Sequence, residues 1–170
     1  MGVRSLKHRV VIVGGGFGGL SLARRLGPLP VDATLVDRHN YHLFQPLLYQ
    51  VATGALSPAN IASPLRSLVK RQRNVRVLCG KVDDVDVVGH RVLVEGAAIE
   101  YDTLVLAAGS SHSYFGHDDW EPYAPGLKTI DDATAIRRRI LESFEIAEWC
   151  GDSDTIKPWI TFVVVGGGPT

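Results

Sequence analysis

Glycine residues near the start of the chain have a spacing that suits the binding of a phosphate group. Gly14, Gly16 and Gly19 form the pattern G-x-G-x-x-G, with Phe17 and Gly18 between the second and third glycine. In such a turn the first glycine permits the bend, the second lets a pyrophosphate approach the backbone, and the third allows close helix packing. The N–H groups and dipole of a following helix then supply positive charge to the phosphates.

The elements that would position this turn lie on both sides of it. Residues 10–13 are an unbroken apolar run, as in a parallel strand buried on both faces, and residues 20–26 continue at helical spacing up to a Gly-Pro pair. Residues 34–36 predict a second strand, which ends at Asp37. An acid at this place accepts hydrogen bonds from an adenosine ribose. The pattern therefore predicts a dinucleotide site, with Asp37 on an unphosphorylated ribose.

A second glycine turn begins near the other end of the sequence. The apolar run 160–165 predicts a buried strand, and it leads into three consecutive glycines, of which Gly166 and Gly168 fit the start of the same pattern. The two turns are separated by about 150 residues. A chain with two such turns resembles the flavoprotein reductases, in which the first turn holds FAD and the second holds NADH. We therefore expect FAD at the first turn and NADH at Gly166 and Gly168.

The residues between the two turns predict further strands. Residues 75–78 read as a strand, and the segment 85–101 is broken at Gly89-His90 and at Gly96, which indicates a three-stranded antiparallel meander. The segment 101–110 is then a buried strand that ends in small residues. It matches a Tyr-Asp-x-Leu-Val-Leu-Ala-x-Gly segment that contacts FAD in the flavoprotein reductases. This resemblance implies FAD contacts at Ala108 and Gly109.

The segment 40–54 carries the most specific resemblance. Its sequence, Asn-Tyr-His-Leu-Phe-Gln-Pro-Leu-Leu-Tyr-Gln-Val-Ala-Thr-Gly, is similar to type II NADH:quinone oxidoreductases. The resemblance implies that the turn around Gln45, Pro46 and Leu47 borders the flavin ring, and that electrons pass from NADH through FAD to a membrane quinone. The residues expected to bind FAD are Gly14, Gly16, Phe17, Gly18, Gly19, Asp37, Arg38, Gln45, Pro46, Leu47, Val82, Ala108 and Gly109.

The predicted fold class is α/β, a Rossmann-like parallel sheet with an antiparallel three-stranded meander crossover, followed by the start of a second Rossmann unit. We expect residues 1–125 to be the first segment of an FAD-binding domain. Residues 126–158 should hold a linker helix, whose start is marked by the capping-box spacing of Thr129 and Asp132. Residues 159–170 should be the first strand and glycine turn of an incomplete NADH-binding domain. The resemblance thus implies the amino-terminal part of a longer enzyme.

Two other functions stay open at this point. The chain as it stands could be a catalytically silent FAD-binding fragment, or it could belong to another two-dinucleotide flavoprotein such as a sulfide:quinone oxidoreductase, which would need cysteines around the flavin. Cys79 and Cys150 are the only cysteines and lie far apart in sequence, so neither disulfide exchange nor a metal site is expected. No residue of the chain is a confident catalytic acid or base, so the catalytic residues are unknown.

The charge pattern bears on partners and location. Lys and Arg equal Asp and Glu at 18 each, which gives no reason to expect a nucleic acid partner. One basic stretch is interpreted as a solvated helix face rather than a contact with an anionic membrane; its members are Arg66, Lys70, Arg71, Arg73 and Arg76. The first residues are too weakly apolar for a signal peptide. We expect a protein on the cytoplasmic side, peripheral to the inner (plasma) membrane through regions absent here. The strand 160–165 would have to dock elsewhere, exchange between chains or leave an apolar edge exposed, so we also expect the isolated chain to self-associate as a homo-oligomer.

Overall fold

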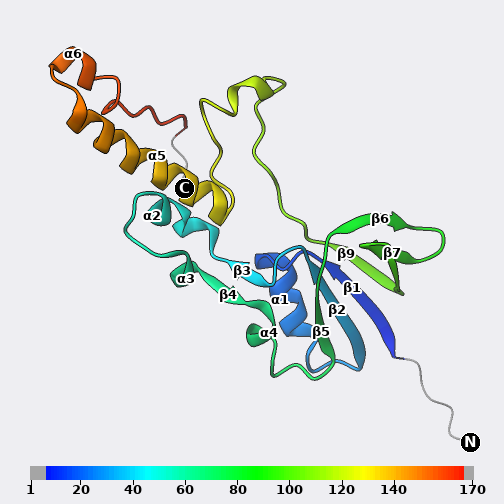
Figure 1. Ribbon diagram of the computed structural model, residues 1–170. Helices are drawn as coiled ribbons and strands as arrows, with labels where there is room; N and C mark the ends of the chain where they lie inside the picture. Colours follow the sequence, from blue (N-terminus) through cyan, green and yellow to red (C-terminus); the bar gives the residue numbers. More distant parts are fainter. Residues whose placement is uncertain (1–6, 167–170) are drawn as a thin grey trace, which may run out of the picture. The chain divides into compact units, whose positions relative to one another are not determined.

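The computed structural model describes residues 7–166, and the chain divides into two compact units (Figure 1). The first unit comprises Met1–Leu43 and Ala62–Ser110, and the second comprises Phe44–Ile61 and Ser111–Thr170. This division follows the contacts within the chain and differs from the expected domain boundaries, which stay a prediction.

The first unit is built on a four-stranded parallel sheet with the strand order β5-β2-β1-β9 (Figure 1). Its strands are β1 (His8–Val13), β2 (Val31–Asp37), β5 (Val75–Cys79) and β9 (Thr103–Leu106). The register places Val10 of β1 beside Ala33 of β2 and Thr103 of β9. This arrangement confirms the predicted parallel sheet.

Two connections within the first unit differ in kind. Helix α1 (Phe17–Leu26) leads from β1 to β2, whereas a three-stranded antiparallel meander leads from β5 to β9. The meander strands are β6 (Val82–Asp86), β7 (Arg91–Val94) and β8 (Ala97–Glu100). A short antiparallel pair and a helix complete the unit, namely β3 (Tyr41–Leu43), β4 (Ala62–Pro64) and α4 (Leu65–Leu68). The predicted meander crossover is therefore confirmed.

Each face of the parallel sheet has its own apolar core. Successive side chains of a strand point to opposite faces, so Val10 and Ile12 pack on one side of β1 and Val11 on the other. On the first face the strand side chains pack against α1 and α4, and on the second face they pack against the meander. The first core contains Val10, Ile12, Leu20, Ala23, Leu35, Leu65, Val69 and Val77. The second contains Val11, Val36, Val92, Val94 and Tyr101. Burial on both faces explains why residues 10–13 of β1 form a continuous apolar run.

The second unit is helical. Its elements are the 3-10 helices η1 (Gln45–Leu47) and η2 (Asp118–Trp120), with α2 (Leu48–Ala52), α3 (Pro58–Ile61), α5 (Ile130–Trp149) and α6 (Ser153–Ile156). Helix α5 begins at the predicted capping box: the Thr129 hydroxyl accepts from the Asp132 N–H, and the Asp132 carboxylate accepts from the Thr129 N–H. No helix of the part of the chain that is described has both the length and the hydropathy needed to cross a membrane.

The predicted strand 160–165 is wrong for this structure. Residues 161–166 have no regular secondary structure, and Val163, Val164 and Val165 are 83%, 86% and 84% exposed. A strand needs a neighbour that accepts and donates its backbone hydrogen bonds. Within residues 7–166, no strand pairs with this segment. Whether the segment belongs to an NADH-binding domain stays a prediction.

Candidate functional site

The carboxyl ends of the parallel strands form the edge at which a ligand would bind the first unit. From β1 the chain passes through α1 to β2 on one side, and it later returns to β9 on the other side of β1. Ligands of open α/β sheets bind where the strand order reverses in this way, outside the carboxyl ends of the strands. The turn after β1 and the segment after β9 lie side by side, since both begin at the carboxyl edge of the sheet and β1 and β9 are neighbours.

Two glycines of the turn are required by the packing of the protein itself. Gly14 has a φ of +107°, and a Cβ built there would lie 2.2 Å from the carbonyl oxygen of Ala107. A Cβ at Gly19 would lie 1.8 Å from the carbonyl oxygen of Gly14. Both separations are far shorter than any real contact. Gly14 therefore allows the bend against the segment after β9, and Gly19 allows α1 to approach β1, as the sequence predicted.

Gly16 has a different environment. It is the N-cap of α1, it is exposed, and a Cβ built on it would meet no atom within 4 Å. Phe17 and Gly18 are also exposed, and the first turn of α1 contains no acidic residue. The first N–H groups of a helix have no partner within the helix. This place thus offers free room beside amide donors and a positive dipole end, which fits the pyrophosphate of a dinucleotide.

Asp37, at the end of β2, is bonded to the glycine turn. Its Oδ2 accepts a hydrogen bond of 2.5 Å from the Gly15 N–H, and its Oδ1 accepts one of 2.7 Å from the His39 N–H. An ionised carboxylate has about four lone-pair sites, so two such bonds leave capacity for ribose hydroxyls. Asp37 therefore positions the turn and keeps acceptors for a ligand.

His42 is a contact that sequence reasoning did not assign to the turn. Its Nδ1 lies 3.0 Å from the carbonyl oxygen of Gly15. Because a carbonyl oxygen only accepts, His42 donates this bond and carries a proton on Nδ1. The imidazole also meets the Phe17 ring edge-on, with centroids 5.0 Å apart. The Gly15 backbone is thus bonded at its N–H by Asp37 and at its carbonyl by His42.

The other expected residues of the first unit occupy several places. Ala108 and Gly109 are exposed and follow Ala107, the residue that packs on Gly14. Gly109 has a φ of +77°, and a Cβ there would meet nothing within 4 Å. Arg38 directly follows Asp37 and is exposed, whereas Val82 is half-buried at the start of β6. Ala108, Gly109 and Arg38 therefore lie just past strand ends at the carboxyl edge.

The remaining expected residues belong to the second unit. Gln45, Pro46 and Leu47 form η1, and the Gln45 amide donates to the Lys128 carbonyl oxygen at 3.4 Å. Gly166 has a φ of +97°, which fits the bend of a glycine turn, while Gly168 lies outside the described residues. Among the described residues of either unit, no three His, Cys, Asp or Glu side chains are grouped as metal ligands.

The family follows from comparison of the sequence. The profile of the family described as pyridine nucleotide-disulphide oxidoreductase matches residues 8–170, nearly the whole chain. The chain belongs to this family. Membership accounts for the glycine turn and the parallel sheet together, which are the features that position a dinucleotide.

Several named oxidoreductases are similar to this chain in sequence. Two Mycobacterium tuberculosis (strain ATCC 25618 / H37Rv) proteins, each named a type II NADH:quinone oxidoreductase, are 50% identical over 96% of this chain and 36% of their own length. The external NADH-ubiquinone oxidoreductase 2 of Saccharomyces cerevisiae mitochondria is 32% identical over 96% of this chain and 32% of its own length. The chain thus spans about a third of the length of these relatives.

Solved structures confirm the fold class of this family member. A structure of NDH2 from Plasmodium falciparum in complex with NADH matches with a TM-score of 0.79 and 27% identity, covering 89% of this chain and 32% of that chain. The sulfide:quinone oxidoreductase of Aquifex aeolicus matches with a TM-score of 0.71 and 27% identity, covering 81% of this chain and 32% of that one. The predicted α/β, Rossmann-like architecture is confirmed.

Proposed function

We propose that this chain is the FAD-binding part of a type II NADH:quinone oxidoreductase, which passes electrons from NADH through FAD to a membrane quinone. The observation that carries the proposal is the glycine turn: Gly16 has open space at the start of α1, and Asp37 is bonded to the same turn. The identity of 50% with two proteins named type II NADH:quinone oxidoreductase supports the specific activity.

The described residues have clear tasks toward a bound FAD. The amide groups at the start of α1 would hold its pyrophosphate, and the free acceptor sites of Asp37 would hold its ribose. When bound, FAD supplies the electron-transfer chemistry, since it accepts two electrons from NADH and passes them on. Gly14 and Gly19 keep the turn closed, and His42 and Asp37 fix the Gly15 peptide between them.

Several finer points belong to the same proposal. Gln45, Pro46 and Leu47 would border the flavin ring, and Gly166 with Gly168 would face NADH, while no described residue is assigned a catalytic role. The relatives named above carry NADH and quinone or ubiquinone in their names, so we infer NADH and a quinone as the partners. A quinone dissolved in lipid places the enzyme at a membrane. We propose peripheral attachment at the cytoplasmic side of the inner (plasma) membrane.

A second candidate is sulfide:quinone oxidoreductase activity, which the match to the Aquifex aeolicus enzyme favours. That reaction would need cysteines around the flavin. Cys79, at the carboxyl end of β5, is the one cysteine of the first unit, and Cys150 follows α5 in the second. A single thiol in the unit that carries the glycine turn makes this candidate the weaker one.

The test is an absorbance spectrum of the purified chain after incubation with excess FAD and desalting, followed by addition of NADH. Retained flavin bands that NADH bleaches support the proposal. Retained bands that NADH leaves unchanged indicate a catalytically silent FAD-binding fragment, and bleaching by sulfide alone favours the second candidate. A Gly16→Val variant is the matched control, because its side chain would occupy the open space and prevent flavin retention while the fold stays intact.

A further inference from the structure

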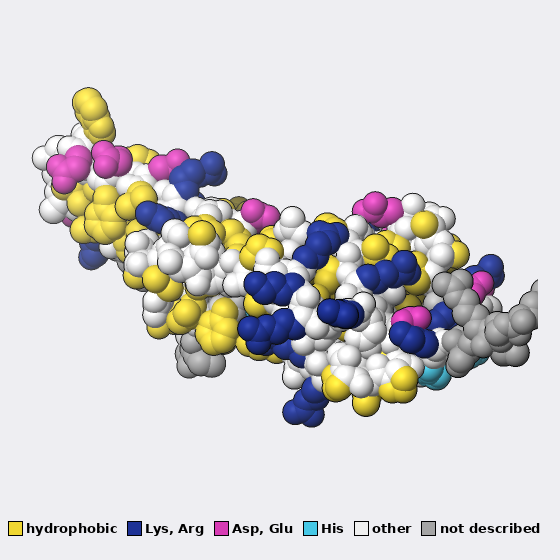
Figure 2. All heavy atoms as spheres, turned by 90° about the horizontal axis from the view of Figure 1, so that it is seen from below, with side chains coloured by type: hydrophobic (Ala, Val, Ile, Leu, Met, Phe, Trp, Pro, Cys, Tyr) yellow, Lys and Arg dark blue, Asp and Glu magenta, His cyan; other side chains and the backbone are white. Residues whose placement is uncertain are grey.

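The acidic and basic residues balance in number over the whole chain but are unevenly distributed along it. Between Asp37 and Asp83 the sequence contains no Asp or Glu at all. The same interval contains the basic residues Arg38, Arg66, Lys70, Arg71, Arg73, Arg76 and Lys81. Figure 2 shows Lys and Arg side chains grouped together on one face, next to hydrophobic side chains. The first unit therefore has a local positive field that the net charge does not reveal.

At the amino-terminal edge of the sheet, opposite the glycine turn, one loop carries three of these cations, Lys70, Arg71 and Arg73, and lies beside a second, uncharged loop. Residues 27–30 lead into β2, and residues 69–74 lead into β5. The Asn74 amide joins the two loops, since its Nδ2 donates to the carbonyl oxygens of Leu26, Leu29 and Val31 at 3.0, 3.1 and 2.9 Å. The loops consequently form one fixed surface.

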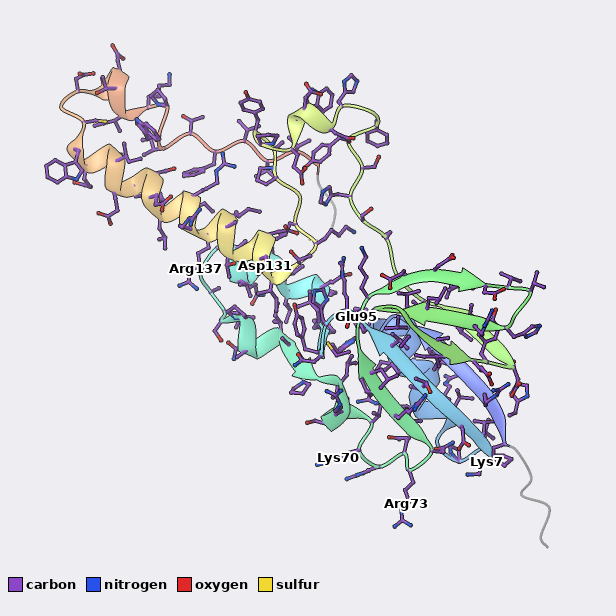
Figure 3. All side chains as sticks on the ribbon, turned by 45° about the vertical axis from the view of Figure 1, so that its right-hand side comes forward. Lys7, Lys70, Arg73, Glu95, Asp131 and Arg137 are labelled. Carbon is purple, nitrogen blue, oxygen red and sulfur yellow. The ribbon has the colours of Figure 1, made fainter. Side chains whose placement is uncertain are left out.

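We name this surface the basic edge. Its cations are Arg25, Lys70, Arg71 and Arg73, all of them exposed. Within the described residues, none of the four has an ion pair or a side-chain hydrogen bond. The nearby acid Asp32 pairs with Lys7 at 3.6 Å. Figure 3 shows Lys70 and Arg73 pointing away from the ribbon at the end where β5 begins, with Lys7 at the start of β1. The basic edge thus carries uncompensated charge.

An apolar tip lies within the basic edge. Pro28, Leu29 and Pro30 are exposed, and Leu29 keeps 49% of its surface in contact with solvent. Asn74 holds this loop through the Leu29 carbonyl, so the tip has a fixed conformation. A small apolar protrusion surrounded by cations matches a lipid interface, where the cations meet anionic headgroups and the apolar side chain enters the acyl boundary.

We propose that the basic edge docks on an anionic lipid surface. The sequence alone favoured a solvated helix face; the structure adds the pinned apolar tip and the joining of the two loops. The glycine turn lies at the opposite end of the strands, so the basic edge is separate from the candidate dinucleotide site. Its four cations and its apolar tip include no aromatic side chain on which a nucleic acid base would stack, which disfavours RNA as the occupant. The inference holds whether or not flavin binds.

Vesicle sedimentation with the full chain tests this inference. Vesicles of mixed phosphatidylcholine and phosphatidylglycerol should bind the chain at low salt, and vesicles of phosphatidylcholine alone should not. Each cation at an anionic surface is worth about a fivefold change in binding, so the Lys70→Glu/Arg73→Glu variant should bind at least ~25-fold more weakly. Leu29→Ser should weaken binding and leave its salt dependence unchanged. The control Arg138→Glu/Lys157→Glu removes two exposed cations of the second unit and so changes the net charge equally.

The outcomes separate the alternatives. Loss of binding in the Lys70→Glu/Arg73→Glu variant and retention in the control support the docking surface. Equal loss in both variants means that net charge alone governs binding and overturns the proposal, as does equal binding to neutral vesicles. Binding to single-stranded RNA in preference to the anionic vesicles also overturns it. Circular dichroism confirms that the variants fold, and flavin retention, measured separately, reports only on the proposed function.

Discussion

The Gly15 N–H donates a hydrogen bond of 2.5 Å to Oδ2 of Asp37, so the acid at the end of β2 holds the glycine turn in place. The sequence rule assigns an acid at this spacing to the ribose of a dinucleotide. In the structure the same side chain also has a structural role, because its hydrogen bond to the Gly15 N–H forms within the protein and needs no ligand. Asp37 thus couples the stability of the first unit to the shape of its candidate site.

Replacement of Asp37 by alanine should destabilise the chain and weaken FAD retention together. The Gly15 and His39 N–H groups would lose their acceptor, and a partly buried donor left unpaired costs about 1–3 kcal/mol. The free energy of unfolding, measured by chemical denaturation, should fall by that amount. Asp32→Ala on the same strand is the control: its ion pair with Lys7 is exposed, so its effect should stay within about 0.5 kcal/mol. Equal effects of the two substitutions would contradict the role of Asp37.

Alanine at Gly14 and at Gly16 should have opposite consequences. Gly14→Ala places a Cβ 2.2 Å from the Ala107 carbonyl oxygen at a φ of +107°, so the fold itself should lose stability, by roughly 2 kcal/mol or more. Gly16→Ala meets no protein atom, so its thermal midpoint should stay near that of the unaltered chain while FAD affinity falls. Thermal unfolding and flavin titration of both variants check this. Unchanged FAD affinity in Gly16→Ala would exclude a ligand from that space.

Features of the fold that depend on neighbours in sequence could be predicted. The glycine turn, the capping box of Thr129 and Asp132 and the breaks of the meander each follow from residue types within a few positions, and the structure confirms them. The roles of Gly14 and Gly19 were predictable because the backbone conformation and the close helix approach admit only glycine.

Contacts between distant residues could not be predicted in the same way. His42 lies 27 positions after Gly15, and no spacing rule links a histidine to a backbone carbonyl across a connection of that length. The contact of Ala107 with Gly14 depends on which strand lies beside β1. The segment 160–165 shows the opposite error: its apolar residues predict a strand, but a strand also requires a partner for its backbone, and residues 7–166 supply none.

The ion pair of Arg9 and Asp102 should make the stability of the first unit depend on pH. Hydrogen bonds from the Arg9 guanidinium, including Nη2 to Oδ1 at 2.9 Å, hold the pKa of Asp102 well below its usual range. A carboxyl whose pKa is lowered in the folded state adds stability above its unfolded pKa, and this contribution is lost as the pH falls through the folded value. The ion pair joins the start of β1 to the residue before β9, so its loss should weaken the pairing of these two strands.

The measurement compares Asp102→Asn with the unaltered chain in chemical denaturation at several pH values. The difference in denaturation midpoint should be present at about pH 7 and should shrink below about pH 4, where unfolded Asp residues take up a proton. Asp32→Asn should give a small difference throughout, because its exposed pair with Lys7 at 3.6 Å contributes little. A midpoint difference for Asp102→Asn that stays constant down to acidic pH would contradict the ion-pair account.

The exposed segment near Val164 should make the chain associate with itself. Val163, Val164 and Val165 are each more than four-fifths exposed, and the backbone around them has no strand partner among the described residues. Unpaired backbone beside β-branched side chains is a template for pairing with another chain. Light scattering should therefore show species larger than a monomer that increase with concentration. Val164→Lys places a charge in the segment and should shift the population to monomer, while Val88→Lys, on a valine of the meander turn that is 95% exposed, should not. A monodisperse monomer in the unaltered chain would rule out association through this segment.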